Sequence, residues 1–222
     1  MPAAPDLSPV LAFLDELRLN NTKTWFDTHR PAYAAARAAF EQFVNGLIDE
    51  FRGTDRLEGL SAKDCIPRIY RDMRFSKDKS PYKTNLAALI APGGWKDFRS
   101  GYYVSIEPHG HSLTAGGLYD PTPAQLAAFR QAIDRNAAPF KRVLGAARFV
   151  EAFGELEGER LKTAPKGYDR EHPEIALLQL KSITAVHHFS DSEVLKADLT
   201  GKVIGVCQAM RPFLDSLDEM VQ

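Results

Sequence analysis

The stretch GYYVSIEPHGHSLTAGGLY, from Gly101 to Tyr119, decides the fold class of this 222-residue chain. It opens with GYYVSIEP, a run rich in aromatic and β-branched side chains, which favour a half-buried strand. A turn signal at PHGH follows, and a second run, HSLTAGGLY, comes directly after it. Two such runs with a short turn between them predict an antiparallel hairpin.

Further strand-like runs lie on both sides of this hairpin. IPRIYRDMRF (66–75) alternates between side-chain types, and LAALIAP (86–92) is a short apolar run. Turn signals at SKDKSP and PGGW separate these runs from their neighbours. Much later in the chain, SITAVHHF (182–189) also predicts a strand. We therefore expect an antiparallel sheet from residues about 66–119 plus this later strand.

Helical patterns flank the predicted sheet. Ser8-Pro9 is a good helix start, and apolar residues from Tyr33 to Phe51 form one helical stripe. After the sheet, the run from Thr122 to Gln125 resembles a capping box with proline at the first helical position. The last thirty residues again look helical, and we expect Pro212 to kink or split them. The pattern predicts one α+β domain over residues 1–222, its sheet covered by N- and C-terminal helices.

Bulk composition narrows the class of protein. A net charge of −1 argues against a general DNA-coating protein, and 44% hydrophobic residues are typical of a soluble globular chain. No apolar run reaches the length of about 18 residues that a membrane span needs, and the N-terminal residues lack the pattern of a signal peptide. Cys65 and Cys207 stand far apart and indicate neither a disulfide framework nor a zinc site. We expect a cytoplasmic protein without membrane association.

Positive charge is concentrated in IPRIYRDMRFSKDKSPYKTN, from Ile66 to Asn85. Six basic and two acidic residues give this segment a local charge of +4, and Tyr70, Phe75 and Tyr82 are interleaved with them. As a strand, its first part would place Arg68, Tyr70, Asp72 and Arg74 on one polar face. Arg71 would then face the core among apolar neighbours, where a guanidinium needs a carboxylate partner. We expect Glu107 or Asp120 to supply that carboxylate.

The loop that follows, SKDKSPYKTN, combines lysines, hydroxyl groups and backbone N–H groups. A phosphate or carboxylate is bound by these groups, and arginine adds bidentate geometry. The predicted anion-binding residues of this segment are Arg68, Arg74, Lys79, Tyr82 and Lys83. The alternative is a solvated turn whose charges are structural, and the sequence leaves both interpretations open.

A second loop, LKTAPKGYDREHPE (161–174), repeats this chemistry. Lys166 and Tyr168 are further candidate ligand-binding residues, and Gly167 permits a close approach of the backbone to a ligand. The same residues are also ordinary turn chemistry. Whether the two loops form one site is not decided by the sequence.

Candidate acid–base groups come from both segments and from the hairpin. Proton transfer would fall to Asp72, Glu107, Asp169 or His172, if local interactions tune their pKa values. His109-Gly110-His111 is typical of a turn more than of a metal site, and we predict no metal. The chain holds no GxGxxG, GxxxxGK[ST] or GxSxG motif, so no cofactor is indicated.

Four blocks of the chain resemble one protein family. They are NNTKTWFDTHRPAY (20–33), RIYRDMRFSKDKSPYKTN (68–85), GYYVSIEP (101–108) and LKTAPKGYDREHPEIALLQLKS (161–182). These blocks are similar to those of DUF2461, a bacterial family of uncharacterised proteins. The resemblance spans nearly the whole chain and implies a single α+β unit. It supplies no activity, cofactor or catalytic residue.

Three functions are consistent with these patterns. The first is an enzyme or ligand-binding domain that takes a small phosphorylated or carboxylated compound at the basic–aromatic segment. A nucleic-acid-binding module is the second, because tyrosines between basic residues suit base stacking and backbone contacts. The third is a non-catalytic interaction protein whose basic segment is structural. The oligomeric state and the presence of catalysis are left open.

Overall fold

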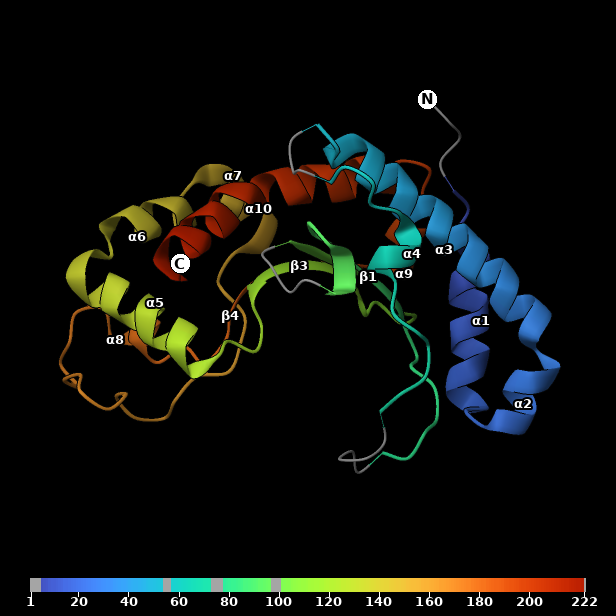
Figure 1. Ribbon diagram of the computed structural model, residues 1–222, viewed down its shortest axis with the longest axis horizontal. Coiled ribbons are helices and arrows are strands. Elements are labelled where there is room, and N and C mark those ends of the chain that lie inside the picture. The colour runs from blue at the N-terminus through green and yellow to red at the C-terminus, as the bar shows by residue number, and fades with distance from the viewer. Residues whose placement is uncertain (1–4, 54–56, 73–77, 97–100, 222) are drawn as a thin grey trace. The chain divides into compact units, whose positions relative to one another are not determined.

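A computed structural model describes residues 5–53, 57–72, 78–96 and 101–221 (Figure 1). The chain divides into two compact units. The first comprises Met1–Thr114 and His188–Gly205, and the second comprises Ala115–His187 and Val206–Gln222. The sequence-based assignment of a single domain over residues 1–222 stays a prediction.

The α+β fold class is confirmed, with one four-stranded antiparallel sheet in the order β1-β2-β3-β4. Its strands are β1 (Leu86–Ile90), β2 (Tyr102–Ile106), β3 (Ser112–Leu118) and β4 (Ile183–Phe189). Every residue of β1 is buried, as expected for a short apolar run, and the register pairs Leu86 with Ile106 and Ile90 with Tyr102. These four strands match the predicted runs closely.

The turn between β2 and β3 is held from another element. His109 and Gly110 both have positive φ angles, 67° and 74°. Their backbone N–H groups donate to the two carboxylate oxygens of Asp191, each at 2.9 Å, from α9 (Asp191–Val194). His109 Nε2 also lies 2.8 Å from Asp15 Oδ1. The histidine therefore has a structural role in this turn.

The expected strand over residues 66–75 is wrong for its described part, Ile66 to Asp72. This segment makes a single bridge to the chain that follows it, Tyr70 opposite Tyr82, through Arg71 N to Pro81 O (3.0 Å) and Lys83 N to Ile69 O (2.8 Å). The ladder does not continue regularly, because the residue that pairs with Arg71 is Pro81, which has no N–H to donate back to Arg71. Proline removes a ladder hydrogen bond and so limits strand pairing. The sheet therefore begins at Leu86.

In the first unit, helices pack beside the sheet. α1 (Ser8–Leu19) lies alongside α3 (Arg30–Phe51), and both match the predicted helices (Figure 1). The buried stripe of α3 consists of Ala36, Phe40, Phe43, Val44, Leu47, Ile48 and Phe51. In the chain, the short helix α2 (Lys23–Thr28) connects α1 to α3. Thr22 caps its N-terminus, because the Thr22 Oγ1 accepts from Trp25 N at 3.3 Å. The short elements α4 (Ala62–Cys65) and η1 (Gly94–Lys96) contact β1.

The second unit is built around phenylalanines. Its helices are α5 (Pro123–Asn136), α6 (Ala138–Leu144), α7 (Ala147–Phe153), α8 (Ile175–Leu178) and most of α10 (Leu199–Val221). Phe140 lies 5.6 Å from Phe129 and 5.9 Å from Phe213, measured between ring centroids, and all three are buried. The predicted capping box of Thr122 and Gln125 is present at the start of α5.

Two local features of this unit test the sequence patterns. α10 runs without interruption through Pro212, so a split there is wrong. Pro212 is exposed, and on the solvent side of a helix water can pair with the carbonyl that a proline leaves without a donor. Gly117 in β3 has a φ of 119°, and a Cβ there would lie 2.2 Å from Ile183 O. The glycine therefore permits the close approach of β3 and β4.

None of the described helices has the length and apolarity needed to cross a membrane.

Candidate functional site

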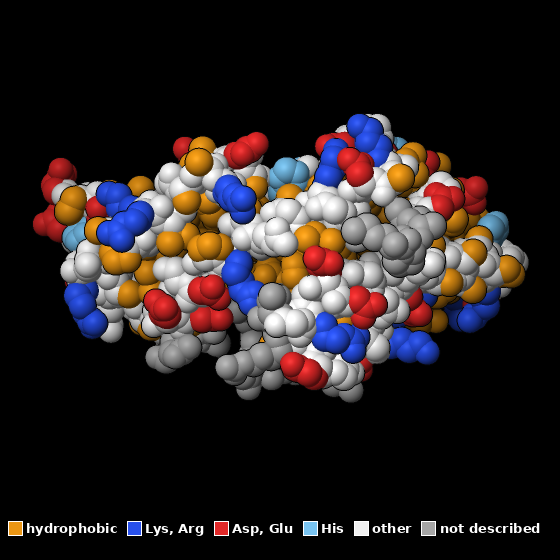
Figure 2. All heavy atoms as spheres, turned by 90° about the horizontal axis from the view of Figure 1, so that it is seen from above, with side chains coloured by type: hydrophobic (Ala, Val, Ile, Leu, Met, Phe, Trp, Pro, Cys, Tyr) orange, Lys and Arg blue, Asp and Glu red, His pale blue; other side chains and the backbone are white. Residues whose placement is uncertain are grey.

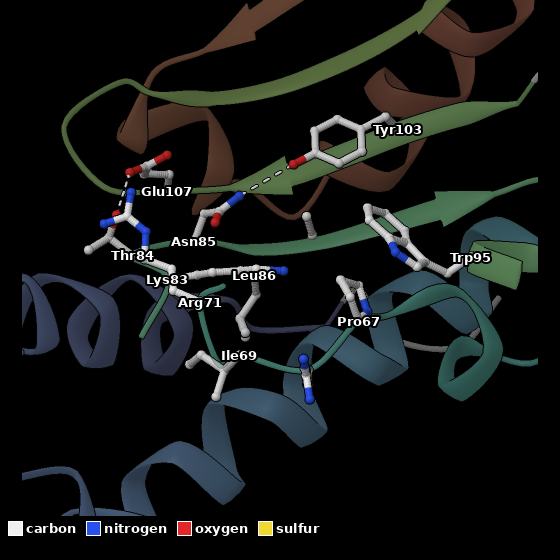
Figure 3. A pocket seen from close by; sticks show the side chains of 12 residues that line it. Pro67, Ile69, Arg71, Lys83, Thr84, Asn85, Leu86, Trp95, Tyr103 and Glu107 are labelled. Carbon is white, nitrogen blue, oxygen red and sulfur yellow. Dashed lines mark hydrogen bonds between the residues drawn. The ribbon is translucent and has the colours of Figure 1, made fainter. Parts of the chain in front are cut away.

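The candidate site is a cleft of about 370 Å³ in the first unit (Figure 3). One wall is the segment before the Tyr70–Tyr82 bridge, and the other is formed by β1, β2 and the residues that flank them. It is lined by Pro67, Arg68, Ile69, Arg71, Lys83, Thr84, Asn85, Leu86, Ala87, Trp95, Tyr103 and Glu107. The volume lies within the range of small-molecule sites.

Strand periodicity places the polar groups of the sheet wall. Tyr103, Ser105 and Glu107 alternate along β2 and its end, so their side chains share one face. Asn85 Nδ2 donates to Ser105 Oγ at 2.8 Å and lies 3.4 Å from the Tyr103 hydroxyl. Thr84 Oγ1 donates to Glu107 Oε1 at 2.9 Å. The sheet wall thus carries two hydrogen-bonded sets of side chains, Asn85 with Ser105 and Tyr103, and Thr84 with Glu107.

Two cations give the cleft its positive charge. Lys83 is half-buried, and burial, followed by the positive charge of Arg68, lowers the pKa of the Lys83 ammonium. Within the part of the chain that the structure describes, neither Lys83 nor Arg68 has a carboxylate partner. Burial and a neighbouring like charge both disfavour the protonated lysine. The opposite charge of a bound anion would offset both effects.

Arg71 behaves differently from the expectation. It forms an ion pair with Asp78, not with Glu107 or Asp120, and its side chain is 37% exposed and so does not face the core. Hydrogen bonds from Ser80, followed by the Arg71 guanidinium, lower the pKa of Asp78 to about 2. The inward position followed from the assumed strand, and it fails because that strand does not form. Arg71 still lines one end of the cleft, but its charge is already compensated.

Tyr82, a predicted ligand-binding residue, lies in the core. Its ring stacks on Phe26 with 4.1 Å between centroids and an interplanar angle of 13°, and only 2% of the residue is exposed. Asn21 holds the Tyr82 backbone on both sides, accepting from its N–H at 3.1 Å and donating to its carbonyl at 3.0 Å. Tyr82 therefore anchors the segment that carries Lys83.

The other predicted residues of this segment lie elsewhere. Arg74 lies outside the described residues. Lys79 and Asp72 are exposed. Of the predicted set from this segment, the cleft brings together Arg68 and Lys83, with Glu107 from the end of β2.

The predicted residues of the second loop belong to the second unit. Lys166 is exposed, and the Tyr168 ring meets the His172 ring edge-on at 6.4 Å. His172 Nδ1 accepts from Glu174 N at 3.0 Å, so the proton of the neutral ring sits on Nε2, 3.1 Å from Asp134 Oδ1. Asp169 Oδ1 accepts from Glu171 N at 2.9 Å. The side chains of Asp169 and His172 are therefore engaged in local hydrogen bonds.

Sequence patterns missed the aromatic part of the cleft. Trp95 follows a glycine turn, and only the fold brings it to the wall that Tyr103 also lines. The signal for Tyr103 was present in the alternation of GYYVSIEP, which places it on the same face as Glu107.

No group of three or more His, Cys, Asp or Glu residues able to hold a metal ion occurs in the described ranges.

Comparison with known proteins identifies the family. A family model described as a conserved hypothetical protein (DUF2461) matches residues 9–215. The chain belongs to the DUF2461 family. The matched span of this DUF2461 protein includes the whole cleft and both basic loops. No curated protein and no solved structure matches the chain.

Proposed function

We propose that this DUF2461 protein binds a small phosphorylated or carboxylated compound in the cleft, with Lys83 and Arg68 contacting the anion. The observation that carries this proposal is the pair of adjacent cations without a carboxylate partner among the described residues. A half-buried ammonium beside a guanidinium is unfavourable on its own. An anion that accepts hydrogen bonds from both groups compensates the charge and strengthens the bonds.

The surroundings of these cations support a small ligand. Thr84 and Asn85 supply neutral hydrogen-bonding groups, while Pro67, Ile69 and Leu86 supply apolar surface. Small-molecule sites combine a mostly apolar wall with a few polar groups that orient the ligand. Of the four acid–base candidates, Glu107 lines this cleft, and it is the group available for proton transfer to a bound compound.

The alternatives have weaker support. Figure 2 shows Lys and Arg side chains interspersed with Asp and Glu on one face, whereas nucleic-acid binding favours a face of one charge. The Arg71–Asp78 pair supports a structural role for part of the basic segment. That role does not extend to Lys83 and Arg68, whose charges lie on the cleft.

We also propose a cytoplasmic location. Cys65 and Cys207 are both buried free thiols, which suits a reducing compartment. Burial raises the pKa of Cys65 to about 12, so this thiol is a weak nucleophile. Fractionation of cells that express the protein tests this location, and recovery outside the cytoplasm would contradict it.

Calorimetric titration with inorganic phosphate and with acetate tests the proposed function. We expect the Lys83→Gln protein to bind phosphate about ten- to a hundredfold more weakly, because a charge-assisted hydrogen bond contributes about 1.5–3 kcal/mol. Lys196→Gln is the matched control, since Lys196 is an exposed lysine of the same unit that does not line the cleft, and its affinity should equal that of the unsubstituted protein. Absence of binding of both phosphate and acetate, or equal anion affinities of the Lys83→Gln and Lys196→Gln proteins, would overturn the proposal.

A further inference from the structure

The cleft has two chemically different ends. Figure 3 shows Thr84 and Glu107 together at one end and Pro67 and Trp95 at the other, and the Lys83 side chain extends along the cleft toward the Trp95 end. Trp95 and Tyr103 form an aromatic pair with 6.4 Å between ring centroids and an interplanar angle of 47°. The Lys83 ammonium and this aromatic pair therefore line the same cleft.

The size of the cleft is the first step of the inference. Inorganic phosphate would occupy only a small part of a volume of about 370 Å³. The remaining space along Pro67, Leu86 and Trp95 is apolar and suits a group that leaves water readily. A flat ring gains most there, because offset stacking on an indole adds to the gain from burial alone.

The carboxylate of Glu107 limits the number of anionic groups on the ligand. Its Oε1 accepts from Thr84, and the group lies at the opposite end of the cleft from Trp95 (Figure 3). A second anionic group reaching that end would meet this negative charge, and like charges repel at short range. A hydrogen-bond donor at that end, by contrast, would meet an acceptor.

We propose that the cleft selects an aromatic or heteroaromatic compound with a single phosphate or carboxylate group, the anion on Lys83 and the ring against Trp95. This inference rests on the proposed function and adds the class of ligand to it. The shared chemistry is one anion on a flat ring. The probes below separate aromatic phosphate monoesters from aromatic carboxylic acids.

The test compares four probes on the unsubstituted protein by calorimetry: phenyl phosphate, inorganic phosphate, benzoate and acetate. We expect phenyl phosphate to bind roughly tenfold more tightly than inorganic phosphate, or benzoate roughly tenfold more tightly than acetate, from ring stacking and burial. The pair that shows the preference identifies the anion. If phosphate binds in a Lys83-dependent way and neither ring compound binds more tightly, the inference is overturned and the proposed function stands. If none of the four probes binds, both fail.

Tryptophan fluorescence locates the ring. The chain has two tryptophans, so in the Trp25→Phe protein the emission comes from Trp95 alone. Trp25 lies in α2, where its ring stacks on His29, the residue after the helix, and it does not line the cleft. The change to phenylalanine keeps an aromatic ring there. We expect the preferred ring compound to change the Trp95 emission, and the Trp95→Leu protein to lose the ring preference while retaining phosphate binding. Tight binding of the ring compound without a change in Trp95 emission would overturn the placement of the ring.

Discussion

The two basic loops of the chain, residues 66–85 and 161–174, have similar compositions and different environments. In the second unit, the loop cations Lys162, Lys166 and Arg170 are exposed and do not line the cleft, and His172 bonds to Asp134. In the first unit, Lys83 and Arg68 border a cleft and have no carboxylate partner within the described ranges. Charge count alone therefore does not identify a binding site. The decisive property is whether the uncompensated charges border a cleft.

The largest expected effect concerns the tyrosines of the two loops. We expect Tyr82→Ala to lower the free energy of unfolding by about 3–4 kcal/mol, because it removes a buried ring stacked on Phe26. Tyr168→Ala should lower it by about 1 kcal/mol, since Tyr168 is only partly buried. Urea denaturation followed by circular dichroism measures both. Similar losses for the two variants would remove the distinction between an anchoring and a peripheral tyrosine.

Substitution of one arginine in each unit compares a structural with a ligand-binding role. Arg130→Met should destabilise the protein by about 2 kcal/mol, because two part-buried carbonyls lose a charged donor. Arg68→Met should leave stability within about 0.5 kcal/mol, because Arg68 is exposed, but it should weaken phosphate binding. The urea midpoint and calorimetry report these two properties separately. Loss of stability in Arg68→Met with unchanged phosphate binding would reverse the assignment.

Removal of the Lys83 charge should raise the free energy of unfolding slightly, whereas the substitutions above lower it or leave it unchanged. Because the pKa of Lys83 in the folded protein is lowered, its charged form is disfavoured by folding. Lys83→Met should therefore raise stability slightly, by ~0.5 kcal/mol or less, since the group is half exposed and screened. The gain should be present below the lowered pKa and should vanish as the pH rises above the ordinary lysine range. Lys166→Met, at an exposed lysine of the second loop, is the control, and an equal gain there would contradict the account.

Anion binding should also couple to protons. A bound anion favours the ammonium form of Lys83 and raises its lowered pKa, so binding at alkaline pH should take up a fraction of a proton. Calorimetry in two buffers of different ionisation enthalpy measures this uptake. In the Lys83→Met protein the uptake should disappear, and its persistence there would assign the proton to another group.

Local patterns predicted the parts of the fold that depend on local chemistry. The alternation in 101–119, the apolar run at 86–92 and the cap at Thr122 each correspond to an observed element. Each of these signals acts over a few residues, through side-chain periodicity or a single capping hydrogen bond. The same kind of signal failed at 66–72, where the partner of Arg71 is Pro81, which has no N–H for the return bond of a longer ladder.

The candidate site was predicted only in part, because long-range packing decides it. The burial of Tyr82 depends on Phe26 and Asn21, more than fifty residues earlier in the chain. The presence of Trp95 in the cleft depends on how its turn packs beside β1. Lys83 and Arg68 were among the predicted residues because their charge is visible in the sequence. Their lack of a carboxylate partner is a property of the folded chain.

The most direct test of the central claim is a crystal structure of the protein grown in inorganic phosphate, solved in parallel with that of the Lys83→Gln protein. The account predicts an ordered anion within hydrogen-bonding distance of Lys83 Nζ and the Arg68 guanidinium, and its absence from the Lys83→Gln structure. A carboxylate of the protein bound to Lys83, or an anion retained at the same place without the lysine, would contradict it.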